Sequence, residues 1–139
     1  MVLLGTQMVK SCLVFFLSAA VGIRWVQSTV PLRERVLKPD PGKYRQIQDG
    51  RDWKNPYLVV HRDGVEIVGL TPAEHLIPVE LVGSELERLP DSAWPYGLVV
   101  AVQDNSLLRS SRDLPQIRAN RGKLLQLLER LGITADLWP

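Results

Sequence analysis

The chain has 139 residues, with 17 basic and 15 acidic side chains and a single cysteine. The two excess bases, Lys10 and Arg24, precede residue 29, where no acid stands, so residues 29–139 are formally neutral. A neutral region has no general electrostatic drive towards nucleic acid, and we expect no nucleic-acid partner. Cys12 also precedes residue 29, so the fold must hold without disulfides.

The first 28 residues are typical of an export signal. Lys10 supplies a positive charge, and the run Ser11–Ile23 is apolar or small. This run is shorter than the roughly 20 residues that a helix needs to cross a bilayer, but it suits the roughly 7–15 residues of a signal's apolar region. The pattern favours cleavage before Thr29, with Met8 as an alternative start.

The same segment has a second interpretation, as an uncleaved membrane anchor with Trp25 at the interface and Arg24 reaching water. We therefore predict an exported protein. It is periplasmic or extracellular if residues 1–28 are removed, and otherwise is attached to the membrane only through residues 11–28.

Residues 29–55 are predicted to be a linker or arm, because prolines and glycines interrupt them and no apolar periodicity is present. Tyr44 and Ile47 are candidates for pinning part of this arm to the domain. The folded domain itself is predicted over residues 56–139.

The domain is predicted to begin with a β-hairpin. Two strand-like runs, Tyr57–Arg62 and Val65–Val68, flank Asp63-Gly64, the strongest short signal for a two-residue turn. Such a loop fixes the register of the two strands. The expected cross-strand pairs are Arg62 with Val65, His61 with Glu66, Val60 with Ile67, and Val59 with Val68.

A single helical turn, a helix and a strand are expected next along the chain. Thr71–Glu74 has capping-box spacing and predicts a single helical turn. The near-continuous apolar run Tyr96–Gln103 predicts a central strand that is covered on both faces. Between them, Pro78–Leu89 predicts a helix with the apolar stripe Val79, Val82, Leu86 and Leu89.

A second helix is expected to start at Asp113 as its cap and to end at Gly132, with a short strand over Ile133–Trp138. The order is then β-hairpin, α, β, α, β. This order predicts an α/β (α+β) fold, a small mixed sheet with helices on one face. The apolar face of the second helix carries Ile117, Leu124, Leu128 and Leu131.

The order of elements over Tyr57–Trp138 resembles the periplasmic domains of the ExbD/TolR family, which follow one membrane helix. That helix carries an acidic residue that couples to proton flow, whereas Ser11–Ile23 contains none, so the resemblance does not extend to a proton-driven role. Two tracts, DWKNPYLVV at 52–60 and SAWPYGLVVAVQ at 92–103, also resemble small exported bacterial proteins. That second resemblance implies no activity.

The residues that metal or cofactor chemistry needs are not clustered along the chain. A zinc site needs three or four ligands, whereas the chain offers two histidines, His61 and His75, and no H-E-x-x-H pattern. His61 is instead expected to pair with Glu66 across the hairpin. No phosphate-binding loop is present, and we predict no cofactor.

The loop Gln103–Arg112 follows the predicted central strand, where α/β folds often place ligands. Arg109 and Arg112 are candidates for holding an anion beside the next helix. Trp94 and Tyr96 are candidate aromatic contacts for a peptide, a glycan or a partner protein. The alternative is that these aromatic residues close the core.

We therefore predict a non-catalytic cell-envelope domain that binds another envelope protein or itself, by strand addition to an exposed sheet edge. The alternative is a small secreted enzyme or ligand-binding protein that uses residues 103–112 with His61 or His75. That alternative requires the loop and the histidines to share a cleft.

Overall fold

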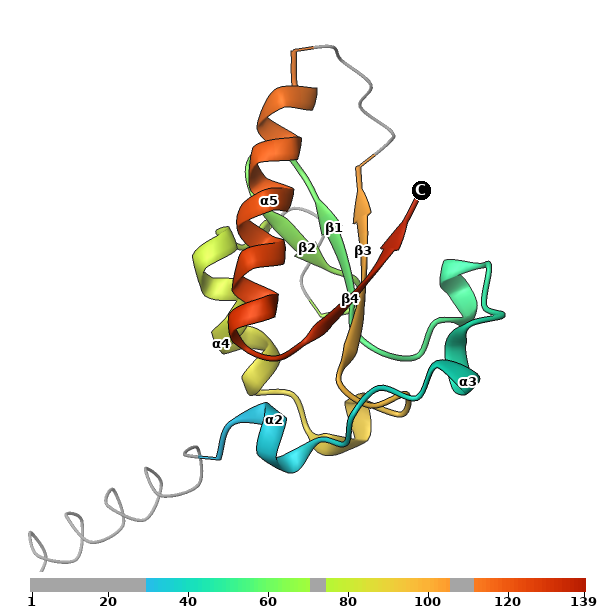
Figure 1. Cartoon of the computed structure of the whole chain (residues 1–139). Coiled ribbons are helices and arrows are strands. Elements are labelled where there is room, and N and C mark those ends of the chain that lie inside the picture. Colours follow the sequence, from blue (N-terminus) through green and yellow to red (C-terminus); the bar gives the residue numbers. More distant parts are fainter. Residues whose placement is uncertain (1–29, 71–74, 106–111) are drawn as a thin grey trace, which may run out of the picture. The chain divides into compact units, whose positions relative to one another are not determined.

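The structure, a computed structural model, describes residues 30–70, 75–105 and 112–139. Its centre is a four-stranded sheet in the order β2-β1-β3-β4 (Figure 1). β1 is antiparallel to β2, whereas β1 and β3, and β3 and β4, are parallel, so the sheet is mixed. The predicted α+β class and order of elements are confirmed. The strands are β1 (Tyr57–Val60), β2 (Val65–Ile67), β3 (Val99–Asp104) and β4 (Thr134–Trp138).

The predicted hairpin register is wrong by two residues. Val60 pairs with Val65 and Leu58 with Ile67, so a four-residue loop replaces the expected two-residue turn. The His61 N–H donates to the Gly64 carbonyl across this loop, at 2.8 Å.

Contacts from outside the hairpin explain the difference. Asn120 Nδ2, on the long helix, donates to the carbonyls of His61 and Arg62 at 2.9 and 2.8 Å, which draws both residues out of the ladder. On the other side, Val65 and Ile77 exchange two backbone hydrogen bonds of 2.8 and 2.9 Å. A Cβ at Gly64 would lie 2.7 Å from the Ile77 carbonyl oxygen, so this close approach requires glycine.

The first predicted helix is divided into a 3-10 turn, η3 (Val79–Leu81), and α4 (Val82–Glu87). Its apolar stripe is confirmed, because Val79, Val82 and Leu86 are buried and Leu89 packs against them. The single turn expected at Thr71–Glu74 lies outside the described residues.

The second predicted helix is α5 (Leu114–Arg130), and it ends as expected at Gly132, whose φ is +74°. Asp113 stands at the N-cap position as predicted, but its side chain makes no capping hydrogen bond and instead accepts from Arg62 Nη1 at 2.9 Å. In the described ranges no helix is long and apolar enough to cross a membrane.

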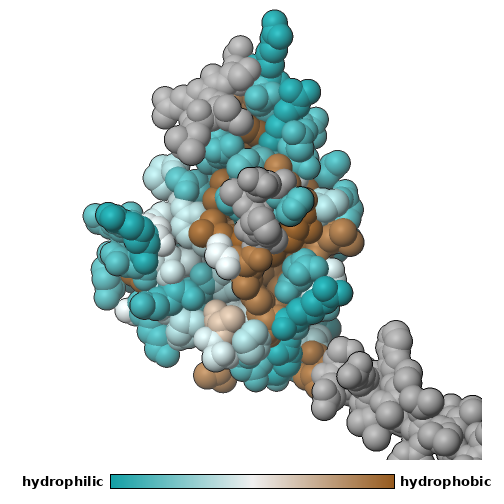
Figure 2. All heavy atoms as spheres, turned by 180° about the vertical axis from the view of Figure 1, so that it is seen from behind, coloured by the Kyte–Doolittle hydropathy of each residue, from teal (hydrophilic) through white to brown (hydrophobic). Residues whose placement is uncertain are grey.

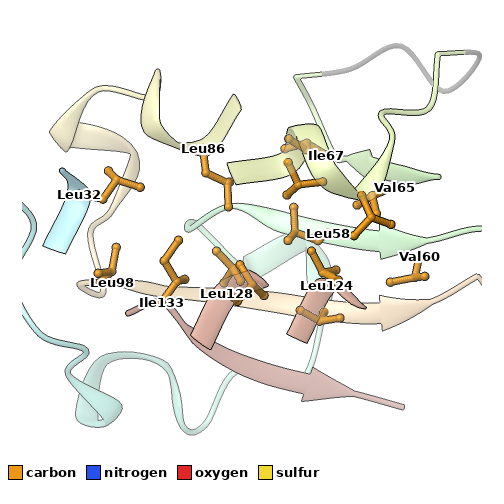
Figure 3. Close-up of a cluster of buried hydrophobic side chains, with 14 of the residues drawn as sticks. Leu32, Leu58, Val60, Val65, Ile67, Leu86, Leu98, Leu124, Leu128 and Ile133 are labelled. Atoms are coloured by element: carbon orange, nitrogen blue, oxygen red, sulfur yellow. The ribbon is translucent and has the colours of Figure 1, made fainter. Parts of the chain in front are cut away.

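Both α4 and α5 cover the same face of the sheet and enclose the main core (Figure 3). Leucine, isoleucine and valine side chains from the strands and the helices point into this layer and leave almost no exposed surface. Burial of one such side chain stabilises the fold by about 1.5–3 kcal/mol. The labelled members are Leu32, Leu58, Val60, Val65, Ile67, Leu86, Leu98, Leu124, Leu128 and Ile133.

The segment that was expected to be a linker is part of the domain, because the compact unit begins at Pro31 rather than at residue 56. Leu32 is only 2% exposed and belongs to the main core. Further on, the Leu37 carbonyl and the Asp40 N–H bond to residues 98 and 96, at 2.9 Å each. The arm contains α2 (Leu32–Arg35), α3 (Pro41–Tyr44) and η2 (Gly50–Asp52).

Asn55, which is 5% exposed, joins the arm to the segment that leads into β3. Its Nδ2 donates to the carbonyls of Gly97 and Val99, both at 2.8 Å, and its Oδ1 accepts from the Tyr96 N–H at 2.9 Å. One side chain therefore serves three backbone groups that have no access to water.

We expect Asn55→Ala to lower the free energy of unfolding by about 3 kcal/mol, because each buried backbone group that loses its partner costs about 1–3 kcal/mol. Urea titration followed by tryptophan fluorescence measures this. Lys54→Ala is the matched control, since that neighbouring residue is exposed and bonds the Tyr96 hydroxyl through its backbone N–H, which the substitution keeps. A change below about 1 kcal/mol for Asn55→Ala would contradict the assigned role.

Candidate functional site

The predicted binding residues that the structure describes are not gathered in one site. Trp94 and Tyr96 are 4% and 8% exposed, so neither ring offers a face to a ligand. The Tyr96 hydroxyl donates to the Asp52 carbonyl at 3.2 Å and accepts from the Lys54 N–H at 3.1 Å. Arg112 is exposed just before α5, and Arg109 lies outside the described residues.

A polar cluster lies where the parallel strands β1 and β3 reach their carboxyl ends. His61 follows β1, and its Nδ1 lies 3.0 Å from Nδ2 of Asn105, which follows β3. Its Nε2 lies 3.5 Å from Oε2 of Glu66 on β2. The predicted contact between His61 and Glu66 is confirmed, although the two residues are not partners in the strand register.

The carboxyl-end cluster (His61, Glu66, Asp104, Asn105 and Arg121) is arranged as internal support. An amide Nδ2 can only donate, so Nδ1 of His61 accepts from Asn105, whereas the buried Nε2 faces Glu66 without a hydrogen-bond partner among the described residues. Both ring nitrogens therefore face protein groups. Asp104 Oδ2 accepts from Arg121 Nη1 at 2.6 Å, and its buried Oδ1 has no hydrogen-bond partner among the described residues.

This cluster brings together only part of what the enzyme alternative requires. His61 does meet the start of the 103–112 segment through Asn105, but His75 is exposed and is not a member of the cluster. Within the described residues, no group of three His, Cys, Asp or Glu side chains is placed to hold a metal ion.

A groove of about 410 Å³ runs between the arm and the segment before β3. Its charged groups already hold the arm in place. Arg35 Nη1 bonds Asp91 Oδ1 at 2.8 Å and Lys43 Nζ lies 3.5 Å from the Pro95 carbonyl, whereas Asp40 accepts from the Gly42 N–H within the arm at 3.1 Å. We therefore interpret the groove as the boundary along which the arm packs against the segment before β3.

Five aromatic rings form a second cluster on the face of the sheet opposite the helices: Tyr44, Trp53, Tyr57, Tyr96 and Trp138. Trp53 is at its centre, with ring centroids 5.1 Å from Tyr96 and 5.8 Å from Trp138 in edge-to-face geometry. Such pairs contribute about 0.5–1.5 kcal/mol beyond their buried area. The cluster seals the second face of β3 and holds β4 to the arm.

The outer edge of β4 is open among the described residues. The Thr134 N–H donates to the Leu98 carbonyl at 3.1 Å, which directs Thr134, and hence Asp136 and Trp138, towards β3. Because backbone groups alternate along a strand, the N–H and C=O of Ala135 and Leu137 point away from the sheet. Leu137 is also 60% exposed. The arrangement suits the addition of one more strand.

Exposed apolar side chains occur elsewhere too. Figure 2 shows apolar residues gathering on the back of the domain, and Val68, Leu70 and Leu81 are each about half exposed. Val68 and Leu70 closely precede residues 71–74, which lie outside the described ranges.

No protein-family model, no curated protein and no solved structure matches this chain. The resemblance to the ExbD/TolR periplasmic domains therefore stays a prediction.

Sequence reasoning missed the two features that matter most here. The amides of Asn55 and Asn120, which are buried, and of Asn105, which is half-buried, carry no sequence signal that separates them from surface residues. The open edge of β4 depends on strand order, and the one available hint was that the short run Ile133–Trp138 contains a charge in its middle.

Burial raises the pKa of the Tyr57 hydroxyl, which donates to Gln103 Oε1 beneath the aromatic cluster. A raised pKa in the folded state means that the neutral form contributes stability below about pH 10, and that this contribution is lost as the pH rises further. We expect the difference in unfolding free energy between the wild type and Tyr57→Phe to shift against the wild type between about pH 9 and pH 11. Urea titrations across this range measure it, and a constant difference would contradict the prediction.

Proposed function

We propose that this chain is an exported cell-envelope protein whose domain is a non-catalytic interaction module. Its contact is the open edge of β4, to which a partner adds a strand. The single observation that carries this proposal is that Ala135 and Leu137 direct their backbone N–H and C=O groups away from the sheet beside an exposed leucine.

A comparison of the two sheet edges supports the choice of β4. The other edge strand, β2, is already paired on its outer side, because Val65 and Ile77 exchange two hydrogen bonds. Proteins usually cover or interrupt an edge, since unpaired backbone groups attract other strands. An edge that stays open next to exposed apolar surface therefore suits the addition of a strand from a partner.

Export is supported by the sequence of residues 1–28, with Lys10 before the apolar run Ser11–Ile23. The confinement of the only cysteine to this segment agrees with a fold that needs no disulfide. The periplasmic or extracellular location, free or anchored, is part of the proposal.

One observation favours the enzyme or ligand-binding alternative. His61 contacts Asn105, so a histidine and the 103–112 segment do meet. The orientation of the ring weighs against catalysis, because its nitrogens face Asn105 and Glu66 rather than open solvent. A ligand-dependent chemical shift confined to residues 103–105 and 112–113 would favour this alternative.

Export is tested by fusing residues 1–55 to alkaline phosphatase, which becomes active only outside the bacterial cytoplasm. We expect activity with the native sequence and its loss when Val14 and Leu17 are both replaced by Asp, because charges prevent insertion of the apolar run. Mass spectrometry of the full chain then distinguishes a start at Thr29 from an intact anchor. An inactive native fusion would contradict export.

The interaction role is tested in cells with a photoreactive amino acid at Leu137 on the β4 edge. A matched probe at Lys123, an exposed position on α5, reports chance encounters. We expect a discrete cross-linked adduct from position 137 and none from position 123. Equal labelling from both positions, or none from 137, would contradict the proposal.

A further inference from the structure

Asp136 is the one charged residue of β4, and it stands in the middle of the open edge strand. Its Oδ2 accepts from the Trp138 Nε1 at 2.9 Å, so the indole fixes the orientation of the carboxylate. The pKa of the nearby Tyr44 hydroxyl is raised first by its burial and second by the negative charge of Asp136. The edge therefore presents one positioned negative charge between two residues with free backbone groups.

This charge disfavours the pairing of two copies. An antiparallel β4 pair centred on Asp136 would make four hydrogen bonds through Ala135 and Leu137, but it would set the two Asp136 carboxylates directly opposite each other. Like charges in that position destabilise a sheet, most strongly in a non-hydrogen-bonded pair, where side chains are closest.

Shifting the register removes the repulsion and most of the hydrogen bonds with it. A pair centred on Ala135 would oppose Leu137 to Ile133, whose N–H already donates to the Leu128 carbonyl at 2.9 Å. A pair centred on Leu137 would oppose Ala135 to Pro139, which has no N–H. The charge and its flanking residues together disfavour each of these short antiparallel self-pairings.

We propose that the β4 edge binds an extended, antiparallel segment of a different chain that places Lys or Arg opposite Asp136, with an apolar residue on each side. This inference rests on the proposed function and names the chemistry of its partner. The segment makes the four hydrogen bonds that Ala135 and Leu137 offer, and its basic side chain meets the carboxylate. Its flanking residues lie on the other face of the strand, beside the exposed Leu137.

Peptide binding to the full-length chain, purified in mild detergent, tests this inference. The probes are acetyl-Thr-Val-Lys-Val-Thr-amide and the same peptide with Glu in place of Lys. We expect amide resonances of Ala135 and Leu137 to shift with the lysine peptide, and the lysine peptide to bind about two- to fivefold more tightly than the glutamate peptide. Equal affinities, or shifts located elsewhere, would overturn the inference.

Variants separate charge from structure. Asp136→Asn keeps an oxygen acceptor for Trp138 Nε1 and should abolish the preference, whereas Asp136→Lys should reverse it. Leu137→Pro removes an outward N–H but no hydrogen bond to β3, and should lower the affinity for both peptides. If the preference is the same in the wild type and Asp136→Asn, the inference is wrong.

Self-association gives an independent readout. Sedimentation should find that Asp136→Asn associates more strongly than the wild type, because the variant lacks the opposed carboxylates. A wild type that dimerises as tightly as Asp136→Asn would overturn the inference. If the in-cell cross-link at Leu137 persists in that case, the interaction role stands and only the partner's chemistry is wrong.

Discussion

Both faces of β3 are buried. Val100 and Val102 face the helices, and Val99 and Ala101 face the arm. A strand placed between two apolar layers needs a cover on each side, because burial of apolar surface is the main favourable contribution to folding. The helices α4 and α5 cover one side, and the aromatic cluster centred on Trp53 covers the other. The arm, the Asn55 hydrogen bonds and the place of β4 all follow from this requirement.

Local patterns predicted the elements whose identity depends on their own side chains. Neighbouring residues determine the periodicity or backbone conformation of these elements. Examples are the apolar stripe that ends at Leu89, the αL cap at Gly132 and the apolar run of β3. The fold class could be predicted because those elements, taken in order, have few ways to bury their apolar faces together.

The features that sequence reasoning missed depend on residues far apart in the chain. Asn120 on α5 binds the carbonyls after β1, and Ile77 pairs with β2, so the hairpin register is set from outside the hairpin. The arm has no periodicity because single anchors hold it, Leu32 on one side of the sheet and Trp53 on the other. For Trp94 and Tyr96 the burial fits the alternative that they close the core, and the sequence could not decide between the two because their burial depends on the docked arm.

Trp53 and Trp138 touch within the aromatic cluster, the first from the arm and the second from the edge strand. An indole's emission depends on the rings and charges around it, and Trp138 also donates to Asp136. Any molecule that adds to β4 therefore disturbs a ring system that extends across the sheet face to Tyr44. Tryptophan fluorescence would therefore report binding at the β4 edge without an added label. The same signal would also report whether the arm stays docked, because Trp53 belongs to it.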